Sequence, residues 1–341
     1  MRFRKLIILV FTSFITPITY ASPEISVIKG NPQKGTVIRV LGSGFGNPRF
    51  DFILRDSADA SFLMERLSAP VLLDQNEVWS QKFSKGGLQT NYSGRDLKRG
   101  EDEVVYRGTG STTLGWPTDL KGRSNETLFV SWWFKPLSDP NEFGGSNKFL
   151  RVWDDSNGKH TRMAWTQMHA VYWRKDIDPQ GFVKWGKWQG EVGTWNKFDA
   201  WFNSNTNKMV IKVNGKTVIA VDDFKKSNVT KGLTVGQIGF AANISGRYDH
   251  MVFGFDDIYI SESQARVELS NSSEWKEGIV SEIVSPRSWN DNEISFEYKT
   301  DYLSDSQPIY LYVINENGQV NQKGFPLLSK APEKIAVFKV E

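Results

Sequence analysis

Cysteine is absent from the 341 residues of this chain, and histidine occurs only three times. The lack of cysteine excludes disulfides, cysteine nucleophiles and cysteine-ligated metal sites. The histidines are too dispersed in sequence to show the ligand spacing of a zinc site. A stable fold must therefore depend on its hydrophobic core, and the length is sufficient for one or two such cores.

Long apolar runs are also lacking, and none approaches the roughly 20 residues that a membrane-spanning helix needs. The nearest, Leu6 to Ile15, follows three basic residues and is broken by Pro17. Thr19 and Ala21 then supply the small residues that a signal peptidase recognises. We therefore expect residues 1–21 to be a signal peptide and the protein to be secreted or periplasmic, with no transmembrane segment.

The chain has no marked excess of charge of either sign. It holds 42 Lys and Arg against 39 Asp and Glu, and three of the basic residues lie in the expected signal peptide. The exported form would then carry 39 charges of each sign. Because binding to nucleic acid needs a net basic face, we expect no nucleic-acid partner.

Helical periodicity is nearly absent, whereas short alternating segments rich in β-branched and aromatic residues recur between polar turns. The clearest predicted strands are 127–135, 148–153, 162–173, 197–202, 208–213, 237–241 and 251–260. Asn214-Gly215 predicts a hairpin, because both central residues of a type I′ turn need a positive φ. These patterns predict an all-β protein.

Aromatic residues are abundant, with 13 Trp, 22 Phe and 10 Tyr. A sandwich core uses some of them, but this number of tryptophans exceeds what the interior of a sandwich needs. Exposed aromatic platforms for a ligand are therefore expected.

Two terminal segments differ from the middle of the chain. The opening PEISVIKGNPQKGTVIRVLGSGFGN resembles the start of an IPT/TIG immunoglobulin-like domain, in which strand, glycine turn, strand and a GSGFG motif follow in this order. The matching residues are Pro23, Ile25, Gly35, Thr36, Ile38, Gly42, Gly44, Phe45 and Gly46. Residues 265–269, 289–296 and 309–318 resemble the later strands of the same fold. This implies a split domain, with the middle of the chain inserted into it; alternatively, residues 23–56 simply add strands to the middle sandwich.

The middle resembles the concanavalin A/laminin G-like jelly roll of lectins, glycan-binding modules and polysaccharide lyases. The resemblance depends on Gly193-Thr194-Trp195 before KFDAWF, on the hairpin MVIKVNGKTVIAV, and on the closing strand FGFDDIYI. It implies an antiparallel jelly-roll sandwich, concanavalin A-like, beside a smaller Ig-like β-sandwich. The expected divisions after the signal peptide are residues 22–74 (first part of the Ig-like domain and a connector), 75–264 (jelly roll) and 265–341 (second part).

One predicted strand has an unusual face. Taken as one continuous strand, Arg162–Arg174 places Trp165, Gln167, His169 and Trp173 on the same side. Indole rings stack on sugar rings, and the amide and imidazole can hydrogen-bond hydroxyls or a carboxylate. The alternative is a half-buried strand with a satisfied core histidine.

A second predicted strand supports an open groove. Lys197 and Trp201 share one face, opposite the apolar Phe198, Ala200 and Phe202. Since the apolar face must be core, we expect the Lys197 face to be open to solvent.

The groove also resembles the working parts of alginate and glucuronan lyases, which have a Gln-x-His strand and a late-strand tyrosine. The resemblance implies that Gln167, His169, Tyr248 and Arg107 would be catalytic, with a cation and an amide neutralising the uronate carboxylate while His or Tyr takes the C5 proton. The arginine segment here reads YRG, and the YFKAG signature of those enzymes is missing. His250 would lie near the same groove.

Glycoside hydrolysis is disfavoured, because no strand face carries the paired carboxylates that it needs. Asp256 and Asp257 are adjacent, so they should point to opposite faces. They lie where related sandwiches often hold calcium, and we expect them as ligands of a structural calcium ion. No cofactor is otherwise required.

The sequence therefore predicts an exported protein that recognises a polysaccharide, binding an extended glycan in a Trp-lined concave groove. A uronate polysaccharide lyase and a surface adhesin or structural protein are the alternatives, and the sequence does not decide whether the protein is an enzyme. The residues expected to bind the glycan are Trp165, Trp173, Lys197, Trp201 and His250.

Overall fold

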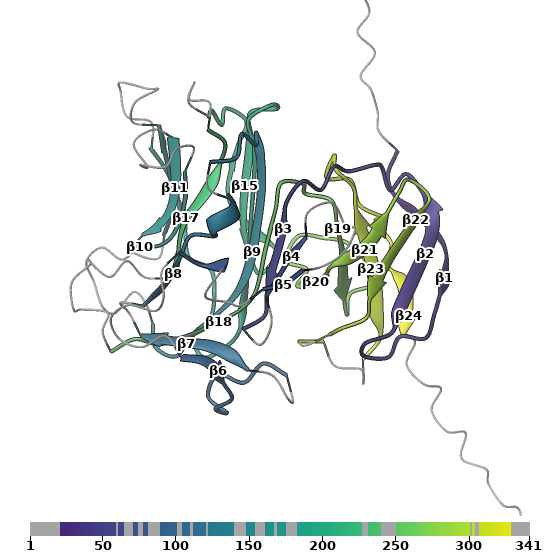
Figure 1. Ribbon diagram of the computed structural model, residues 1–341, viewed down its shortest axis with the longest axis horizontal. Helices are drawn as coiled ribbons and strands as arrows, with labels where there is room; N and C mark the ends of the chain where they lie inside the picture. The colour runs from purple at the N-terminus through teal and green to yellow at the C-terminus, as the bar shows by residue number, and fades with distance from the viewer. Residues whose placement is uncertain are drawn as a thin grey trace, which may run out of the picture.

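The chain forms two β-structured parts that lie side by side in the computed structural model (Figure 1). The structure describes residues 21–58, 61–64, 71–73, 78–80, 89–100, 104–109, 112–120, 122–139, 148–153, 161–166, 169–174, 183–226, 231–239, 250–300, 302–303 and 307–328. The predicted all-β, antiparallel sandwich fold is confirmed. Within these ranges, no helical segment has the length and apolarity to cross a bilayer.

The larger part, which we call the central sandwich, has a ten-stranded sheet on one side. The strands on its main path are, in spatial order, β16 (Lys216–Val221), β15 (Lys208–Val213), β14 (Asn196–Asn203), β9 (Thr127–Pro136), β18 (Val252–Ser261), β3 (Ile53–Asp56), β4 (Ser61–Met64) and β5 (Val71–Leu73). β7 (Val105–Thr109) pairs with β18 and with β6 (Gln89–Tyr92), and η1 (Thr118–Leu120) is one turn of 3-10 helix.

A six-stranded sheet forms the other side of the central sandwich. Its strands are, in order, β13 (Val183–Lys187), β12 (His169–Arg174), β11 (Thr161–Thr166), β10 (Lys148–Trp153), β17 (Thr234–Gly239) and β8 (Thr113–Gly115). The core lies between the two sheets, where Trp132 of β9 stacks on Phe198 of β14 with ring centroids 4.7 Å apart. Ala170 and Tyr172 of β12 enter the same core from the opposite sheet.

The smaller part, which we call the terminal sandwich, is built from both ends of the chain. One sheet has the order β1 (Glu24–Lys29), β2 (Val37–Ser43), β22 (Glu293–Glu297), β21 (Pro286–Trp289), and the other β20 (Glu282–Val284), β19 (Arg266–Ser270), β23 (Ile309–Ile314), β24 (Phe325–Leu328). Ile38 of β2 is the register partner of Phe296 of β22, and both are fully buried. Residues from the two ends thus share one core.

The boundary between the parts lies earlier than the sequence suggests. β3 pairs with β18, and β4 and β5 continue the same sheet, so these three strands belong to the central sandwich. The expected division at 22–74, the first part of an Ig-like domain and a connector, therefore includes three strands of the central sandwich. The segment that contributes strands to the terminal sandwich is 24–43.

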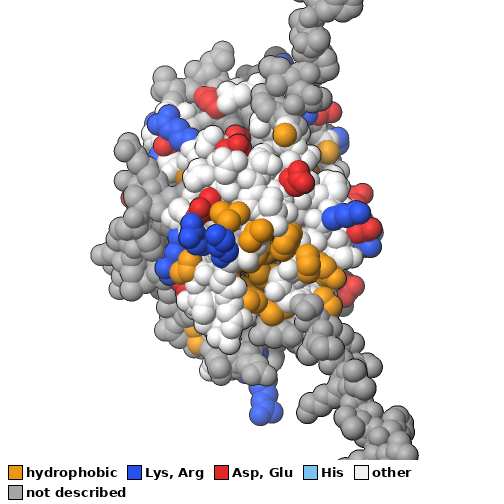
Figure 2. All heavy atoms as spheres, turned by 90° about the vertical axis from the view of Figure 1, so that its right-hand side faces the viewer, with side chains coloured by type: hydrophobic (Ala, Val, Ile, Leu, Met, Phe, Trp, Pro, Cys, Tyr) orange, Lys and Arg blue, Asp and Glu red, His pale blue; other side chains and the backbone are white. Residues whose placement is uncertain are grey.

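The outer end of the terminal sandwich carries an apolar surface. Figure 2 shows hydrophobic side chains gathered on this face, bordered by Lys and Arg. Val27 of β1 and Val37 of β2 are among the exposed hydrophobic residues of this part.

Candidate functional site

The outer face of the six-stranded sheet carries the histidine that the sequence singled out. Since Ala170 and Tyr172 of β12 point into the core, alternation directs His169 and Val171 outward. The neighbouring strand β13 pairs Lys187 with His169 and Trp185 with Val171. Direct partners share a face, so an imidazole, an indole and an ammonium group lie together on this outer face.

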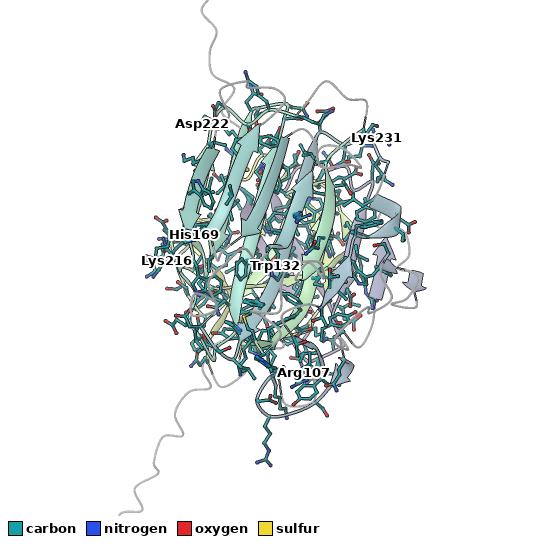
Figure 3. The ribbon with its side chains drawn as sticks, turned by 90° about the vertical axis from the view of Figure 1, so that its left-hand side faces the viewer. Arg107, Trp132, His169, Lys216, Asp222 and Lys231 are labelled. Atoms are coloured by element: carbon teal, nitrogen blue, oxygen red, sulfur yellow. The ribbon has the colours of Figure 1, made fainter. Side chains whose placement is uncertain are left out.

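Trp185 is an exposed large hydrophobic side chain in this group, with 54% of its surface accessible. Its ring meets the half-buried His169 ring edge-on, with centroids 6.1 Å apart and an interplanar angle of 79°. The His169 contact restricts the indole on one side and leaves much of its surface to solvent. Figure 3 looks onto this side of the molecule and shows His169 at its left margin.

The predicted single strand over 162–173 is wrong. The chain turns back between β11 and β12, which pair as an antiparallel hairpin with Thr166 opposite His169. Alternation must then be counted separately in each strand. The backbone position of Trp165 is paired with Ala170, on the core face, and not with His169.

Several of the expected site residues lie outside the description. Gln167 and Tyr248 fall outside the described residues, and for Trp165 and Trp173 only the strand backbone is described. Trp173 is the register partner of Arg162 on β11. Their roles in binding or catalysis stay predictions.

Arg107 and His169 do not come together. Arg107 lies on β7, in the ten-stranded sheet, where its guanidinium sits 5.3 Å from the centre of the Tyr92 ring. Figure 3 shows it at the lower end of the molecule, away from His169. His250 is exposed in the turn that precedes β18. The described residues thus do not assemble the expected catalytic set.

The expectation that the Lys197 face of β14 is open to solvent is wrong, because the terminal sandwich covers it. Lys197 is 2% exposed, and its Nζ lies 3.2 Å from Glu268 Oε2 and 3.3 Å from Ser281 Oγ, both in the terminal sandwich. Trp201, on the same face, is half-buried and packs beside Phe129 and Ala265. The inner face, with Phe198, Ala200 and Phe202, is core as predicted.

Glu268 is the centre of this buried contact. Besides Lys197, Ser281 Oγ donates a hydrogen bond to Glu268 Oε2, and Arg266 Nε donates one to Oε1 over 2.5 Å. Burial alone would raise the pKa of Glu268, but Lys197, Arg266 and the Ser281 hydrogen bond outweigh burial and lower it to about 2. The carboxylate is therefore charged and acts as a structural anion.

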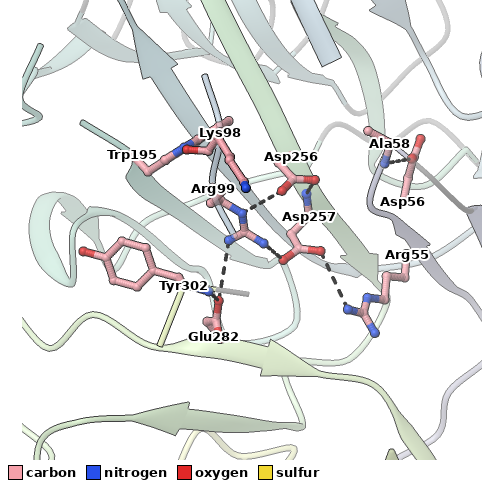
Figure 4. Close-up of polar contacts among 10 residues, drawn as sticks. All are labelled: Arg55, Asp56, Ala58, Lys98, Arg99, Trp195, Asp256, Asp257, Glu282 and Tyr302. Atoms are coloured by element: carbon pink, nitrogen blue, oxygen red, sulfur yellow. Dashed lines mark hydrogen bonds and ion pairs between the residues drawn. The ribbon is translucent and has the colours of Figure 1, made fainter. Parts of the chain in front are cut away.

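Asp256 and Asp257 point at one arginine (Figure 4). Arg99 Nε donates to Asp256 Oδ2 over 2.6 Å, Arg99 also bonds to Asp257, and its Nη1 lies 3.7 Å from Glu282 Oε1. The expected opposite orientation of the two carboxylates is wrong. A β-bulge interrupts β18 here, with Asp257 at φ 42°, and it brings both side chains to the same arginine.

This arrangement does not fit a calcium site. The Arg99 guanidinium, fully buried, already occupies the position opposite both carboxylates. Burial raises the pKa of Asp256 to about 8, even though Arg99 opposes the shift, and the neighbouring Asp257 charge adds to it. Among the described residues, no group of three or more His, Asp or Glu is arranged to hold a metal ion.

Sequence reasoning missed Trp185, Arg99 and Glu268. Trp185 could have been noticed, because VKWGK is a short segment in which a single tryptophan lies between two lysines. Glu268 and Arg99 give no signal in the sequence, because their importance comes from contacts with residues more than 70 positions away.

Comparisons with known proteins place the chain in no family. No family model and no curated protein matches it. Among solved structures, the ligand-binding domain of botulinum neurotoxin serotype D, in complex with N-acetylneuraminic acid, is 10% identical over 78% of this chain and 71% of its own, with a TM-score of 0.39. The binding domain of Paraclostridial Mosquitocidal Protein 1 is also 10% identical, over 78% of this chain and 64% of its own, with a TM-score of 0.39. Domain 4 of the extracellular arabinanase AbnA from Geobacillus stearothermophilus, in complex with arabinotriose, is 14% identical over 48% and 72%, with a TM-score of 0.32. Likenesses this weak identify neither the family nor the function of this chain.

Proposed function

We propose that this protein recognises a polysaccharide on the outer face of its six-stranded sheet. The observation that carries the proposal is Trp185, 54% exposed beside His169 on a face that also presents Lys187. An exposed indole does not contribute the free energy that burial of its apolar surface would give, so the stability of the fold does not explain its position. A sugar ring stacked on the indole supplies one.

The other groups on this face suit a polyhydroxyl ligand. The His169 imidazole donates and accepts hydrogen bonds, and the Lys187 ammonium donates them. β12 and β13 are extended strands, so side chains two residues apart lie on the same face and form a row along each strand. An extended glycan across these strands agrees with the arrangement better than a compact ligand does.

The proposal includes export to the outside of the cell or to the periplasm. The support is the sequence of residues 1–21, which lie almost wholly outside the described part of the chain. Extracellular glycans are found in these compartments, so the location and the ligand agree.

Binding without catalysis is the form that we propose. The arginine expected to act with His169 in a uronate lyase, Arg107, lies on the other sheet, and the expected Gln167 and Tyr248 lie outside the described residues. The expectation of catalysis by His169 is tested by incubating the protein with uronate polymers and following the absorbance of unsaturated products.

The binding proposal is tested by affinity electrophoresis and calorimetry against a panel of neutral and acidic polysaccharides. Trp185→Ala should weaken binding by at least about fivefold, because an aromatic platform contributes roughly 1–3 kcal/mol per stacked ring. His169→Ala should weaken polysaccharide binding less than Trp185→Ala does. No turnover of the polymers is expected in the wild type, so this variant has none to lose. The matched control is Val37→Ala, an exposed apolar residue on the terminal sandwich. Unchanged affinity of the Trp185 variant for every polymer bound by the wild type would contradict the proposal.

Adhesion through the terminal sandwich is a second candidate function. It is favoured by the apolar surface at the outer end of that part (Figure 2) and by the exposure of Val27 on β1 and Val37 on β2. Replacing both valines by Asp should then abolish co-sedimentation of the protein with cells and leave polysaccharide binding intact. Co-sedimentation that depends on Trp185 instead would favour the glycan proposal alone.

A further inference from the structure

A pocket of about 180 Å³ lies at the junction of the two sandwiches, on the face of β14 that the terminal sandwich covers. Its floor comes from β14 and β15, where Asp199 pairs with Lys212 and Trp201 pairs with Val210. Residues of β19 and of the loops after β19 and β23 form the opposite wall. None of its lining residues belongs to the outer sheet face.

Two indoles line this pocket from opposite sides. Trp201 stands on the floor and is held by its contact with Phe129. Trp275 belongs to the terminal sandwich and packs against Tyr312, with ring centroids 5.1 Å apart. Because both rings are fixed by neighbours, a flat apolar ligand face would find them already in place.

Glu268 is paired with two cations at this pocket. Arg266 bonds to Glu268 and lies over the Phe129 ring at 4.3 Å, and Lys197, on the same face of β14 as Trp201, also bonds to Glu268. Asp199 Oδ1 is buried and lies 3.5 Å from Lys197 Nζ, yet it accepts no hydrogen bond from the described residues. A buried acceptor of this kind is costly unless a ligand or water donates to it.

We infer that this pocket binds one uncharged pyranose ring, either a free monosaccharide or the terminal unit of a glycan. The indoles supply stacking faces for the C–H groups of the ring, and a sugar hydroxyl donates to Asp199 Oδ1. A ligand carboxylate placed at Asp199 Oδ1 would meet a negative charge, so a hydroxyl is the favoured group at that position. Drug-sized ligands occupy pockets of roughly 300–1,000 Å³, so this smaller pocket takes a single ring.

This inference stands apart from the polysaccharide proposal, because the two sites share no residue. It also gives Trp201 a sugar-binding role, as a residue of the pocket between the sandwiches and not of the expected groove. The terminal sandwich then does more than support the central one, since the site is incomplete without Trp275.

The test is calorimetric titration of the full exported chain with neutral monosaccharides, their methyl glycosides and the matching uronates. Trp275→Ala should weaken monosaccharide binding by tenfold or more, and Trp275→Phe by less, because a ring is retained. The matched control is Trp185→Ala, which removes a tryptophan from the other site and should leave monosaccharide binding unchanged. Polysaccharide binding should show the reverse pattern.

A second variant guards against loss of structure in the Trp275 variants. Asp199→Asn keeps the side-chain volume and should weaken binding about tenfold, since an uncharged acceptor forms a weaker hydrogen bond. Urea midpoints of all variants identify any that unfold. The inference is overturned if no neutral monosaccharide binds, if the uronates bind more tightly, or if folded Trp275 and Asp199 variants bind as the wild type does. Free monosaccharides and chain ends are distinguished by whether methyl glycosides and oligosaccharides compete.

Discussion

Glu268 holds a negative charge in the buried junction between the sandwiches, with donors from Lys197, Arg266 and Ser281 around it. Removing one member of such a cluster leaves the others buried without a counter-charge. Glu268→Gln should therefore reduce the free energy of unfolding by about 3 kcal/mol or more, measured by urea denaturation.

The control for this prediction is Glu293→Gln on the surface of the terminal sandwich. Glu293 also pairs with an arginine, Arg39, but both side chains are substantially exposed. Exposed pairs contribute less than about 1 kcal/mol, so this variant should lose little stability. Equal losses in the two variants would contradict a special role for the buried cluster.

Asp256 should give the protein a stability that falls as the pH rises. Burial, helped by Asp257 and opposed by Arg99, raises its pKa to about 8 in the folded state, from 3.8 in the unfolded chain. Between these values the folded state binds more protons than the unfolded state, so the stabilisation from Asp256 is lost as the pH rises through this window. Asp256→Asn, which is neutral at every pH, should lose less stability than the wild type between about pH 5 and about pH 8.

The pH prediction is measured as urea midpoints across that range. Asp51→Asn, which alters a surface aspartate paired with Arg49, serves as the control and should follow the wild-type curve. If Asp256→Asn also follows that curve, Asp256 is charged in the folded state and the interpretation is wrong.

Single residues show where sequence reasoning succeeded and where it stopped. Alternation correctly assigned Phe198, Ala200 and Phe202 to the core. It also placed Lys197 on the other face, but alternation cannot distinguish solvent from a second domain. Lys197 was therefore expected in the open, whereas its ammonium is enclosed by Glu268, Ser281 and Asp199.

At the scale of elements, the β15–β16 hairpin follows its sequence directly. Asn214 and Gly215 have φ of 49° and 71°, as the predicted type I′ turn requires. The same turn approaches the terminal sandwich, where Gly278 N donates to Gly215 O over 3.2 Å. A Cβ added at Gly215 would lie 2.1 Å from Ile279 O, so this contact depends on the glycine.

Gly215→Ala should therefore destabilise the protein through two effects, the positive φ and the clash with Ile279. Gly193→Ala isolates the first, because Gly193 has φ of 76° and a Cβ there would meet nothing within 4 Å. We expect a loss of about 1 kcal/mol at Gly193 from backbone strain alone and a clearly larger loss at Gly215. Thermal unfolding measures both losses. Equal losses would mean that the contact between Gly215 and Ile279 adjusts to the added methyl group with no loss of stability.

Two other elements show why periodicity alone was insufficient. The WTQMHAVYW segment contains no Gly, Pro, Asn or Asp to mark a turn, so a hairpin between β11 and β12 could not be distinguished from one long strand. The bulge at Asp256-Asp257 was missed for another reason, since the Gly and the two Asp of FGFDDIYI were assigned to one regular strand. Both errors changed which face a candidate residue occupies, because each strand break resets the alternation.

At the scale of the whole molecule, the ends of the chain meet in one small sandwich. The similarity of residues 23–46 and 265–318 to two halves of one domain type pointed to this arrangement, and β2 does pair with β22. The identity of that domain as IPT/TIG-like stays a prediction. The covering of β14 by the terminal sandwich could not be foreseen, because no local pattern specifies how two domains pack.

The two sandwiches should unfold together, because two buried ionic clusters connect them. Arg99 links Asp256 and Asp257 of β18 to Glu282 of β20, and Lys197 of β14 links to Glu268 of β19. The main cores of the sandwiches are otherwise separate. If the clusters were broken, each sandwich would unfold at its own temperature. The reason is that a charge left unpaired and buried at the junction is more stable when the two sandwiches separate and water reaches it.

Scanning calorimetry of the exported chain should accordingly show one transition, with equal calorimetric and van't Hoff enthalpies. The double variant Arg99→Met, Glu268→Gln should show two transitions, or a calorimetric enthalpy well above the van't Hoff value. The control double variant Arg39→Gln, Arg287→Gln removes two cations whose partners, Glu293 and Glu297, lie within the terminal sandwich, and it should keep a single transition. Two transitions in the wild type would show that the clusters do not couple the sandwiches. A single transition in the Arg99, Glu268 variant would show that the coupling comes from the apolar contacts around Trp201 and Phe129 instead.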